Sequence, residues 1–215
     1  MDHATALSGS FPSKSRQEAV QTTESFLPHL QAEQKSKGYT LVLDLDETLV
    51  HATGEADPAG ECVVNVRPGA IEFVEEMSKY YEVVIFTAGT KDYADYALNF
   101  VDPRKRISHR LYREHAVSKG NVFVKDISRL GRDLKRVIII DNIAENFQLQ
   151  SENGIFINSW EGDANDTILA QLMPILKQIV ELKVPDVRIA LRHYRDYQIR
   201  SIVNKFKPKR TMDFY

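Results

Sequence analysis

The chain has 215 residues, of which 43% are hydrophobic and 27% charged, and its formal net charge is -2. This composition suits a globular protein with a sizeable core and excludes a polycation that binds nucleic acid directly. The single cysteine, Cys62, excludes an internal disulfide and argues against a thiolate zinc site.

No apolar stretch is long enough to span a bilayer, and the N-terminus lacks the apolar core of a secretory signal. We therefore expect a nuclear or cytoplasmic protein, and we expect it to be a monomer. Residues 1–36 are rich in Ser, Gln, Thr and Glu. Such a segment buries too little apolar surface to offset its ordering entropy, so we predict a disordered tail with at most a weak helix around 16–34.

From Tyr39 onward, short apolar runs alternate with helical spacing, and we predict one domain over 37–183. The predicted strands are 41–43, 82–86, 137–140 and 155–157. The predicted helices are 69–80, 90–100 and 164–182, with Pro174 expected to kink the last helix or split its start. This alternation predicts an α/β fold with a central, mostly parallel sheet and helices on both faces.

Residues 184–215 form a basic C-terminal segment. Val187, Leu191 and Tyr194 lie at helical spacing, so the first part is predicted to be a helix docked on the domain, and the end is expected to be extended. A solvated basic face is the favoured interpretation. A nuclear import signal or a site for an acidic partner is the alternative.

Polar residues end three of the predicted strands: Asp44 the first, Thr87 the second and Asp141 the third. In an open parallel sheet, ligands bind beyond the carboxyl ends of the strands. These residues, far apart in sequence, should therefore meet in one pocket.

Asp44 and Asp46 place two carboxylates close together just past a buried strand. Their repulsion would be relieved by a hard cation with oxygen ligands, most plausibly Mg²⁺, and Asp141 and Asn142 supply further oxygens. Asp44 can attack phosphorus as a nucleophile, and Asp46 can act as general acid and then general base. Thr48 is expected to hold Asp46 away until substrate arrives.

Lys125 is expected to stabilise the nucleophile and the phosphoryl oxygens. Thr87, with the backbone N–H groups of Ala88 and Gly89 at a helix start, can hold phosphate oxygens. Each feature alone has an ordinary interpretation: a turn, a surface lysine or a helix cap. Their joint occurrence in this chain order is what favours an active site.

At these residues the sequence resembles the carboxy-terminal-domain phosphatase branch of the haloacid dehalogenase superfamily. The resemblance is carried by LVLDLDETLVH (41–51), FTAGTKDYAD (86–95), FVKDISRLGRDL (123–134) and IIIDNIAENF (138–147). It implies a Rossmann-like fold and a magnesium-dependent protein serine/threonine phosphatase that works through an aspartyl-phosphate. The implied substrate is a phosphoserine or phosphothreonine protein, with the RNA polymerase II tail as one candidate.

The resemblance also implies roles for individual residues. Asp44 is the nucleophile and Asp46 the acid/base. Asp44, the Asp46 carbonyl and Asn142 would reach magnesium, and Asp141 would act through water. Arg113 matches a substrate-contacting arginine, and Tyr93 matches a pocket aromatic.

The segment 52–66 is shorter than the insertion that the family usually carries, so we expect a short hairpin, no large cap domain and an open site. An open site suits a protein substrate, with selectivity from Arg113 and from Lys119, Arg129 and Arg132 if they face the mouth. Two alternatives stay open. One is a catalytically silent phosphopeptide-binding or scaffold module like the mitochondrial translocase subunit, and the other is a small-metabolite phosphatase.

Overall fold

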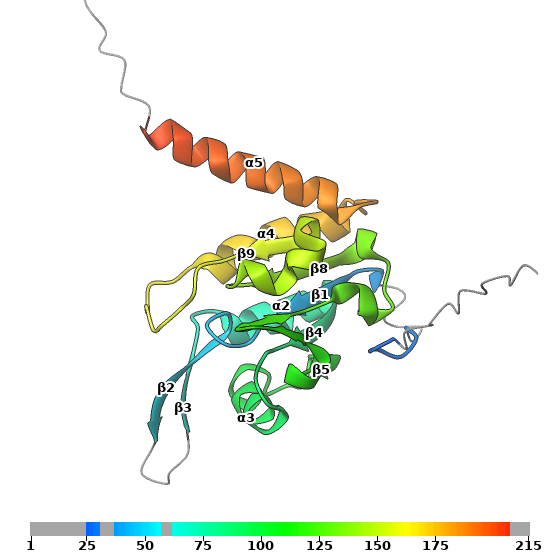
Figure 1. The fold of residues 1–215 in the computed structure, drawn as a ribbon. Coiled ribbons are helices and arrows are strands. Elements are labelled where there is room, and N and C mark those ends of the chain that lie inside the picture. Colours follow the sequence, from blue (N-terminus) through cyan, green and yellow to red (C-terminus); the bar gives the residue numbers. More distant parts are fainter. Residues whose placement is uncertain (1–24, 31–36, 57–61, 207–215) are drawn as a thin grey trace, which may run out of the picture.

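A five-stranded parallel sheet forms the centre of the molecule (Figure 1). The structure is a computed structural model that describes residues 25–30, 37–56 and 62–206. The strand order is β5-β4-β1-β8-β9. The strands are β1 (Thr40–Leu43), β4 (Glu82–Phe86), β5 (His109–Leu111), β8 (Val137–Asp141) and β9 (Gly154–Phe156). The predicted parallel sheet is confirmed, and it gains β5, which the sequence analysis did not assign.

The strands are apolar because both faces of the sheet are covered. Side chains alternate across a strand, so Leu41 and Leu43 enter one core while Val42 enters the other. All three side chains are fully buried.

The α-helices pack into the first of these cores. They are α2 (Ala70–Tyr80), α3 (Lys91–Val101), α4 (Ile168–Glu181) and α5 (Val187–Phe206). Helix α4 begins four residues later than predicted and continues through Pro174 without a break, so the expected split is wrong. The expected start is instead a loop, in which Asp166 pairs with the buried Arg67 at 2.8 Å.

Short 3-10 helices cover the opposite face of the sheet. They are η2 (Ile127–Leu130), η3 (Leu134–Arg136) and η4 (Ala144–Asn153), and η1 (Arg113–His115) follows β5. Ile127, Leu130 and Phe147 from these helices pack against Val84 and Ile139 of the sheet. Helical structure therefore covers both faces, but the α-helices lie on one of them.

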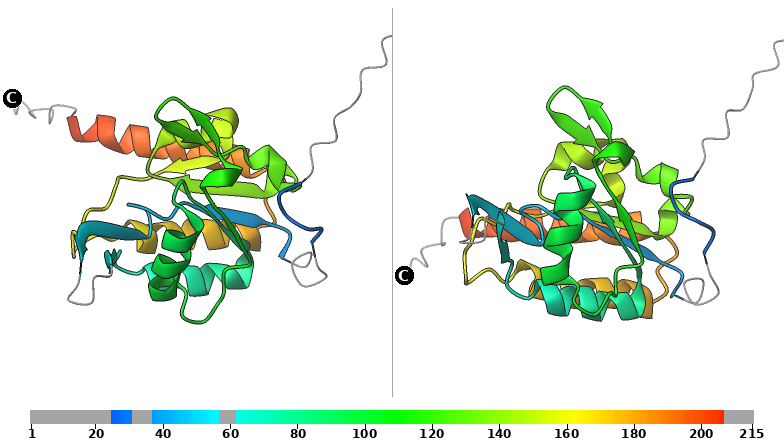
Figure 2. Two further views of the ribbon diagram at one scale, coloured as in Figure 1. Left: turned by 60° about the horizontal axis from the view of Figure 1, so that its bottom comes forward. Right: turned by 90° about the horizontal axis from the view of Figure 1, so that it is seen from below.

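Two hairpins extend away from the sheet (Figure 2). Strands β2 (Val50–Ala56) and β3 (Cys62–Val66) form the short hairpin that was predicted between Asp46 and Thr87. Strands β6 (Val117–Lys119) and β7 (Val122–Val124) form a second hairpin that was not predicted. In the part of this interval that the structure describes, the only other elements are α2 and β4, so no large cap covers the sheet there.

Residues 25–30 correct the prediction of a disordered tail over 1–36. Leu27 is buried in the second core, and the Phe26 amide donates to the Arg129 carbonyl at 2.8 Å. The Phe26 ring meets Phe86 edge-on and lies 4.0 Å from the Arg129 guanidinium. An apolar pair in a polar segment is enough to anchor it here, and no helix forms over these residues. The remainder of the predicted tail lies outside the described residues.

Helix α5 docks as predicted, with Val187 and Leu191 buried and Tyr194 half-buried. It continues to Phe206 and so includes the first two residues of the end that was expected to be extended, and 207–215 lies outside the described residues. Figure 1 shows its C-terminal end extending beyond the sheet. No helix in the described part of the chain is long and apolar enough to cross a membrane.

A buried ion pair lies at the end of the sheet where β1 and β4 begin. Glu82 is fully buried and receives hydrogen bonds from Arg132 at 2.7 and 2.8 Å and from the Thr40 hydroxyl at 2.9 Å. Arg132 also donates to the Pro28 carbonyl at 2.9 Å. Burial alone would raise the pKa of Glu82, but these bonds and the charge of Arg132 outweigh it and lower the pKa to about 2.

Deletions test the contacts of the N-terminal segment. Removing 1–30 should lower the free energy of unfolding by roughly 2–4 kcal/mol, because it exposes the surface that Leu27 and Phe26 cover. Removing 1–24 leaves those contacts in place and is the matched control. Urea unfolding of both variants and the full chain gives the comparison. Equal stability of the two deletions would contradict the packing described for Phe26 and Leu27.

The Glu82 pair predicts a specific pH dependence. Replacing Glu82 by Gln leaves Arg132 buried without a counter-charge and should cost about 3–5 kcal/mol at neutral pH. The folded pKa is below the ordinary value of 4.5, so the carboxylate stabilises the fold above that pH. This contribution is lost as pH falls from 4.5 toward 2, and the difference between wild type and Glu82→Gln should shrink over that range.

The measurement is urea unfolding of both proteins at several pH values. Glu152→Gln is the control, because its pair with Arg192 is exposed on both sides and such pairs contribute about 0–1 kcal/mol. A difference for Glu82→Gln that is the same in acid as at neutral pH would rule out this titration.

Candidate active site

The register of the sheet brings the predicted polar residues together. Leu43 pairs with Ile85 on one side and Ile140 on the other. Asp44 therefore leaves the sheet beside Asp141, and its amide donates to the Ile140 carbonyl at 3.0 Å. The carboxyl ends of β1, β4 and β8 form one site, as the sequence predicted.

Lys125 lies between the two strand-end carboxylates. Its ammonium donates to Asp44 Oδ1 at 2.6 Å and to Asp141 Oδ2 at 2.7 Å. Lys125 and Asp141 are fully buried, and Asp44 is nearly so. Lys125 follows β7, and its amide donates to the Asn146 carbonyl at 2.6 Å, which fixes the backbone at the point where the side chain enters the site.

The charges of this cluster do not balance. Burial raises the pKa of Asp44 to about 7 despite the opposing charge of Lys125, and the charge of Asp141 raises it further. Burial alone would lower the pKa of Lys125, but Asp44 and Asp141 outweigh it and raise that pKa. Lys125 therefore stays protonated between two carboxylates, and the site has room for further positive charge.

Asp141 is the anchor of this arrangement. Its Oδ1 accepts from the Ile143 amide at 2.8 Å, and the Asn146 amide group lies 3.1 and 3.2 Å from the two oxygens. With Lys125 on Oδ2, both oxygens already have donors in the protein. In this structure Asp141 positions Lys125, and its predicted part in metal binding stays a prediction.

Asp46 is held by residues of the second motif. The Tyr93 hydroxyl donates to Asp46 Oδ1, and the Thr87 hydroxyl donates to Oδ2 at 3.2 Å. Thr48 was expected to hold Asp46, but its hydroxyl lies 3.5 Å from Asp44 Oδ2 and 3.3 Å from Asn142 Oδ1. The turn after Asp46 points Thr48 back toward Asp44 and Asn142, which corrects that expectation.

Gly89 has to be a glycine at this turn. Its amide donates to the Thr87 hydroxyl at 2.8 Å. A Cβ at this position would lie 3.1 Å from both the Thr87 hydroxyl oxygen and the Tyr93 ring, and 3.5 Å from Asp46 Oδ2. The missing side chain lets the loop of Thr87, Ala88 and Gly89 close tightly around Asp46.

Oxygen atoms gather where the metal was predicted. Asn142 can present either end of its amide to Asp44. With the nitrogen there, it lies 3.0 Å from Asp44 Oδ2 and 3.3 Å from the Asp46 carbonyl oxygen. With the oxygen there, as in the structure, the Asn142 nitrogen donates to Ser159 and three oxygens converge.

This arrangement fits a magnesium ion. Ligand oxygens about 2.1 Å from an octahedral cation are spaced by about 3.0 Å, close to the spacing found here. Among the described residues, no group of three or more His, Cys, Asp or Glu side chains could hold a metal. The fit therefore depends on a backbone carbonyl and an amide oxygen in addition to Asp44.

Arg67 supports the loop that carries Asp46. It is 1% exposed, and its Nη1 donates to the carbonyls of Glu47 at 3.3 Å and Thr48 at 3.2 Å. Glu47 has a positive φ of 54°, which is costly for a residue with a side chain. The Trp160 amide also donates to the Glu47 carbonyl, at 2.8 Å. These bonds hold the strained turn that directs the Asp46 carbonyl toward Asn142.

Arg113 lies at the rim of the site. Its Nε donates to the Ala88 carbonyl at 2.5 Å, and its guanidinium is 5.3 Å from the Phe123 ring. Of the other cations suggested for the mouth, Arg129 stacks on Phe26 and Arg132 pairs with Glu82. Those two are held elsewhere, so the suggestion is wrong for them.

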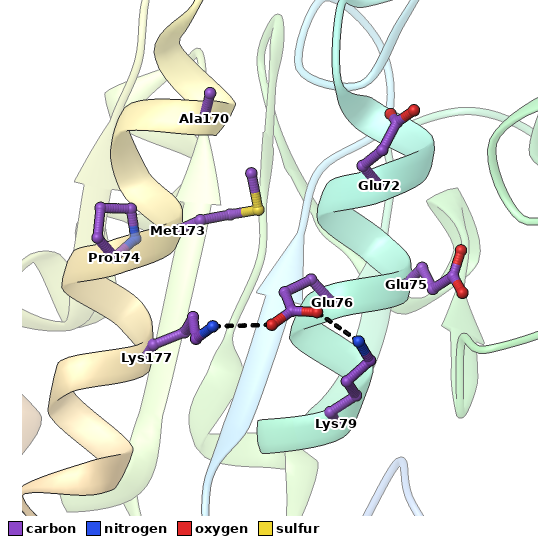
Figure 3. Close-up of a pocket in the computed structure, with 8 residues that line it drawn as sticks. All are labelled: Glu72, Glu75, Glu76, Lys79, Ala170, Met173, Pro174 and Lys177. Carbon is purple, nitrogen blue, oxygen red and sulfur yellow. Dashed lines mark hydrogen bonds and ion pairs between the residues drawn. The ribbon is translucent and has the colours of Figure 1, made fainter.

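A pocket of about 540 Å³ lies between α2 and α4, away from these residues (Figure 3). Lys177 and Lys79 both pair with Glu76 there, at 2.9 and 2.5 Å. None of the residues lining this pocket belongs to the strand-end cluster. Glu75 also pairs, with Arg104, and we assign this pocket no part in the chemistry.

Arg67, Asn146 and Trp160 are the supporting residues that the sequence analysis missed as part of the site. A lone arginine after the apolar run CVVNV was a signal for Arg67, because buried arginines need several acceptors. Asn146 had no such signal, since its role depends on how η4 folds back over β8.

Comparisons with known proteins show the family of this chain. A model of the NLI interacting factor-like phosphatase family matches residues 39–188. "CTD small phosphatase-like protein 3" of Caenorhabditis elegans is 43% identical over 176 residues, which cover 75% of this chain and 60% of that protein. "CTD small phosphatase-like protein 2" of Dictyostelium discoideum is 41% identical over 183 residues, 79% of this chain and 32% of that protein.

A mitochondrial import inner membrane translocase subunit, TIM50 of Candida glabrata, is 37% identical over 178 residues, covering 78% of this chain and 36% of that protein. The matched region thus spans about a third to three fifths of these relatives. Among solved structures, the RNA polymerase II CTD phosphatase Fcp1 aligns with a TM-score of 0.49 and 22% identity, over 84% of this chain and 57% of that one.

The family match covers the sheet, the strand-end cluster and helices α2, α3 and α4. It therefore agrees with the α/β fold described above and confirms the resemblance to phosphatases that the four motifs carry. The chain belongs to the NLI interacting factor-like phosphatase family.

Proposed function

We propose that the protein is a magnesium-dependent phosphatase that acts on phosphoserine or phosphothreonine in proteins through an aspartyl-phosphate. The observation that carries this proposal is the placement of Lys125 between Asp44 and Asp141 at 2.6 and 2.7 Å. A buried ammonium on a strand-end carboxylate orients that carboxylate and offers positive charge where phosphoryl oxygens would arrive.

Transfer of the phosphoryl group from the substrate to the enzyme requires a nucleophile and an acid. Asp44 attacks phosphorus and forms an O–P bond while the bond from phosphorus to the serine oxygen breaks. Asp46 donates its proton to the leaving alkoxide, which departs as the serine hydroxyl. Asp46 then takes a proton from water as that water attacks phosphorus, which releases inorganic phosphate and restores Asp44.

The other residues hold these groups in place. Thr87 and Tyr93 both donate to the Asp46 carboxylate and so fix it beside the phosphate site. Asp44 Oδ2, the Asp46 carbonyl and the Asn142 amide oxygen would hold Mg²⁺. When bound, it supplies positive charge that offsets the phosphate and the two carboxylates. Arg113 at the rim is the proposed contact for substrate.

A protein substrate suits the open site. The hairpin β2–β3 is the insertion between the first two motifs, and small-metabolite phosphatases usually carry a larger cap. Two relatives are named as CTD small phosphatase-like proteins, which supports a phosphoprotein substrate and keeps the RNA polymerase II tail as one candidate.

The second candidate is a silent binding module, favoured by the similarity to translocase subunits. A module without catalytic activity would be expected to have lost the carboxylates of the motifs. This chain keeps Asp44, Asp46, Lys125 and Asp141, and in the structure Lys125 joins two of the carboxylates directly. That assembled cluster is why catalysis is proposed first.

The decisive experiment uses a phosphopeptide panel of serine, threonine and tyrosine phosphates, assayed with Mg²⁺, with Ca²⁺ and with excess chelator. We expect phosphate release with Mg²⁺ only, because Ca²⁺ takes more ligands at longer distances and misplaces the phosphoryl group. Asp44→Asn should lose at least about a thousandfold in turnover, as expected when a nucleophile is removed.

Circular dichroism of Asp44→Asn checks that the fold is retained. Full activity in chelator would overturn the metal assignment, and an active, folded Asp44→Asn would overturn the nucleophile. Phosphopeptide binding without any phosphate release would instead support the silent module.

The acid role of Asp46 predicts a dependence on the leaving group. Asp46→Asn should lose about 100-fold or more on phosphoserine, within the range for general acid–base catalysis. It should lose at least about tenfold less on an aryl phosphate, because a phenolate needs less protonation to leave. Steady-state kcat on both substrates measures this. Equal losses would exclude Asp46 as the acid.

A further inference from the structure

An apolar groove of about 530 Å³ runs beside the edge strand β9. It lies where β9, η4, α4 and α5 meet, elements that pack against one another in Figure 1. Its apolar lining comes from Phe147, Ile155, Phe156, Ile157, Ile168 and Tyr194. The catalytic cluster does not use any of these residues.

Phe156 is the unusual residue of this groove. Its ring is 56% exposed, whereas its neighbours Ile155 and Ile157 are buried in the first core. Ile143, one residue beyond the metal-binding Asn142, is also 44% exposed. Large apolar side chains exposed near one another mark surfaces that bind something.

The groove lies near the catalytic site. Ala144 lines it and lies two residues beyond Asn142, so the groove begins within about 7 Å of that residue. Asn158 lines it too, and its carbonyl accepts from Arg67 at 3.2 Å. Ala144 therefore places one side of the groove near Asn142, and Asn158 places the other beside Arg67, which supports the loop of Asp46.

The backbone of β9 adds a second means of recognition. Of the described strands, β9 lies at one edge of the central sheet and pairs only with β8. The Ile157 amide donates to the Asp141 carbonyl, so the alternation of a parallel ladder turns the backbone groups of Phe156 to the open edge. Arg195 donates to the Gly154 carbonyl at 3.2 Å and closes the far end of that edge.

We propose that this groove binds the substrate chain next to its phosphorylated residue, in an extended conformation along β9, with an apolar side chain in the groove. The proposal rests on the proposed phosphatase function and names its substrate class. An extended peptide advances about 3.3 Å per residue, so it crosses the first stretch of about 7 Å from the site in about two residues. The groove then follows three residues of β9. The peptide residues that reach it should therefore lie about two to five positions from the phosphoserine. Strand addition with an apolar anchor is a known mode of peptide recognition.

Proximity to the site favours the substrate as occupant over other chains. A second copy or a distant segment of this chain would have no reason to dock against the loops of Asn142 and Asn158. The short β2–β3 hairpin leaves selectivity to other surfaces, and this groove is an apolar surface that adjoins the catalytic residues.

The test uses phosphoserine peptides in which one leucine is moved through positions one to eight on either side, with alanine elsewhere. Binding is measured by fluorescence anisotropy with non-hydrolysable phosphonate analogues, and kcat/KM with the phosphopeptides. Leucine at two to five residues on one side should raise affinity and kcat/KM about tenfold over alanine. Phe156→Ala and Gln171→Trp, which fills the groove from the exposed face of α4, should both remove this gain.

Phe100→Ala is the matched control, because Phe100 is 43% exposed on α3 and does not line the groove. Loss of the leucine effect in Phe100→Ala but not in Phe156→Ala would move docking to another face and overturn the proposal. A flat leucine scan would overturn it too. A dimer that Phe156→Ala dissociates would overturn the proposal, because a second copy would then occupy the groove. Higher peptide affinity after deletion of 207–215 would overturn it as well, because that segment would then occupy the groove.

The two proposals fail in distinguishable ways. If only the phosphatase function is wrong, phosphonate peptides bind with the leucine pattern while no phosphopeptide is hydrolysed. If only the groove is wrong, phosphate is released at a rate that does not depend on the position of leucine.

Discussion

The contact of Lys125 with both Asp44 and Asp141 is the interaction on which the rest of the site depends. A buried ammonium between two carboxylates costs desolvation free energy that only close contact on both sides offsets. That requirement fixes the positions of the two carboxylates and explains why Asn146 and the Ile143 amide hold Asp141 in turn. The excess of negative charge that remains is the physical reason why a cation is proposed on the far side of Asp44.

A second constraint is the strained turn that follows Asp44. Glu47 adopts a left-handed conformation, and the bonds from Arg67 and Trp160 to its carbonyl keep it there. Arg67 in turn pairs with Asp166, so the loop before α4 is bound to the first motif. The first motif is therefore supported by Arg67 and, through it, by Asp166 much later in the chain. Asp166 makes this pair from the loop that precedes α4.

Much of this arrangement could be predicted from local pattern. Apolar runs ending in Asp44, Thr87 and Asp141 fix the strands and their common edge, since parallel strands place their carboxyl ends together. The hydrogen-bond partners of individual side chains within the site could not be predicted. Thr48 faces Asn142 and Tyr93 faces Asp46 because of how two turns close, which sequence spacing does not encode. Likewise, Phe26 and Leu27 form too short a pattern to indicate packing against a distant face of the sheet.

The family match begins at residue 39, yet the second core already includes Leu27. The start of the family match and the start of the packed core differ. The match depends on motifs that carry the chemistry, whereas the core includes any apolar side chain that packs on the sheet. A relative with another sequence upstream must close the same face over Val84 and Ile139 in its own way. The cover that Phe26 and Leu27 give to this face is thus a part of the fold that lies outside the family match.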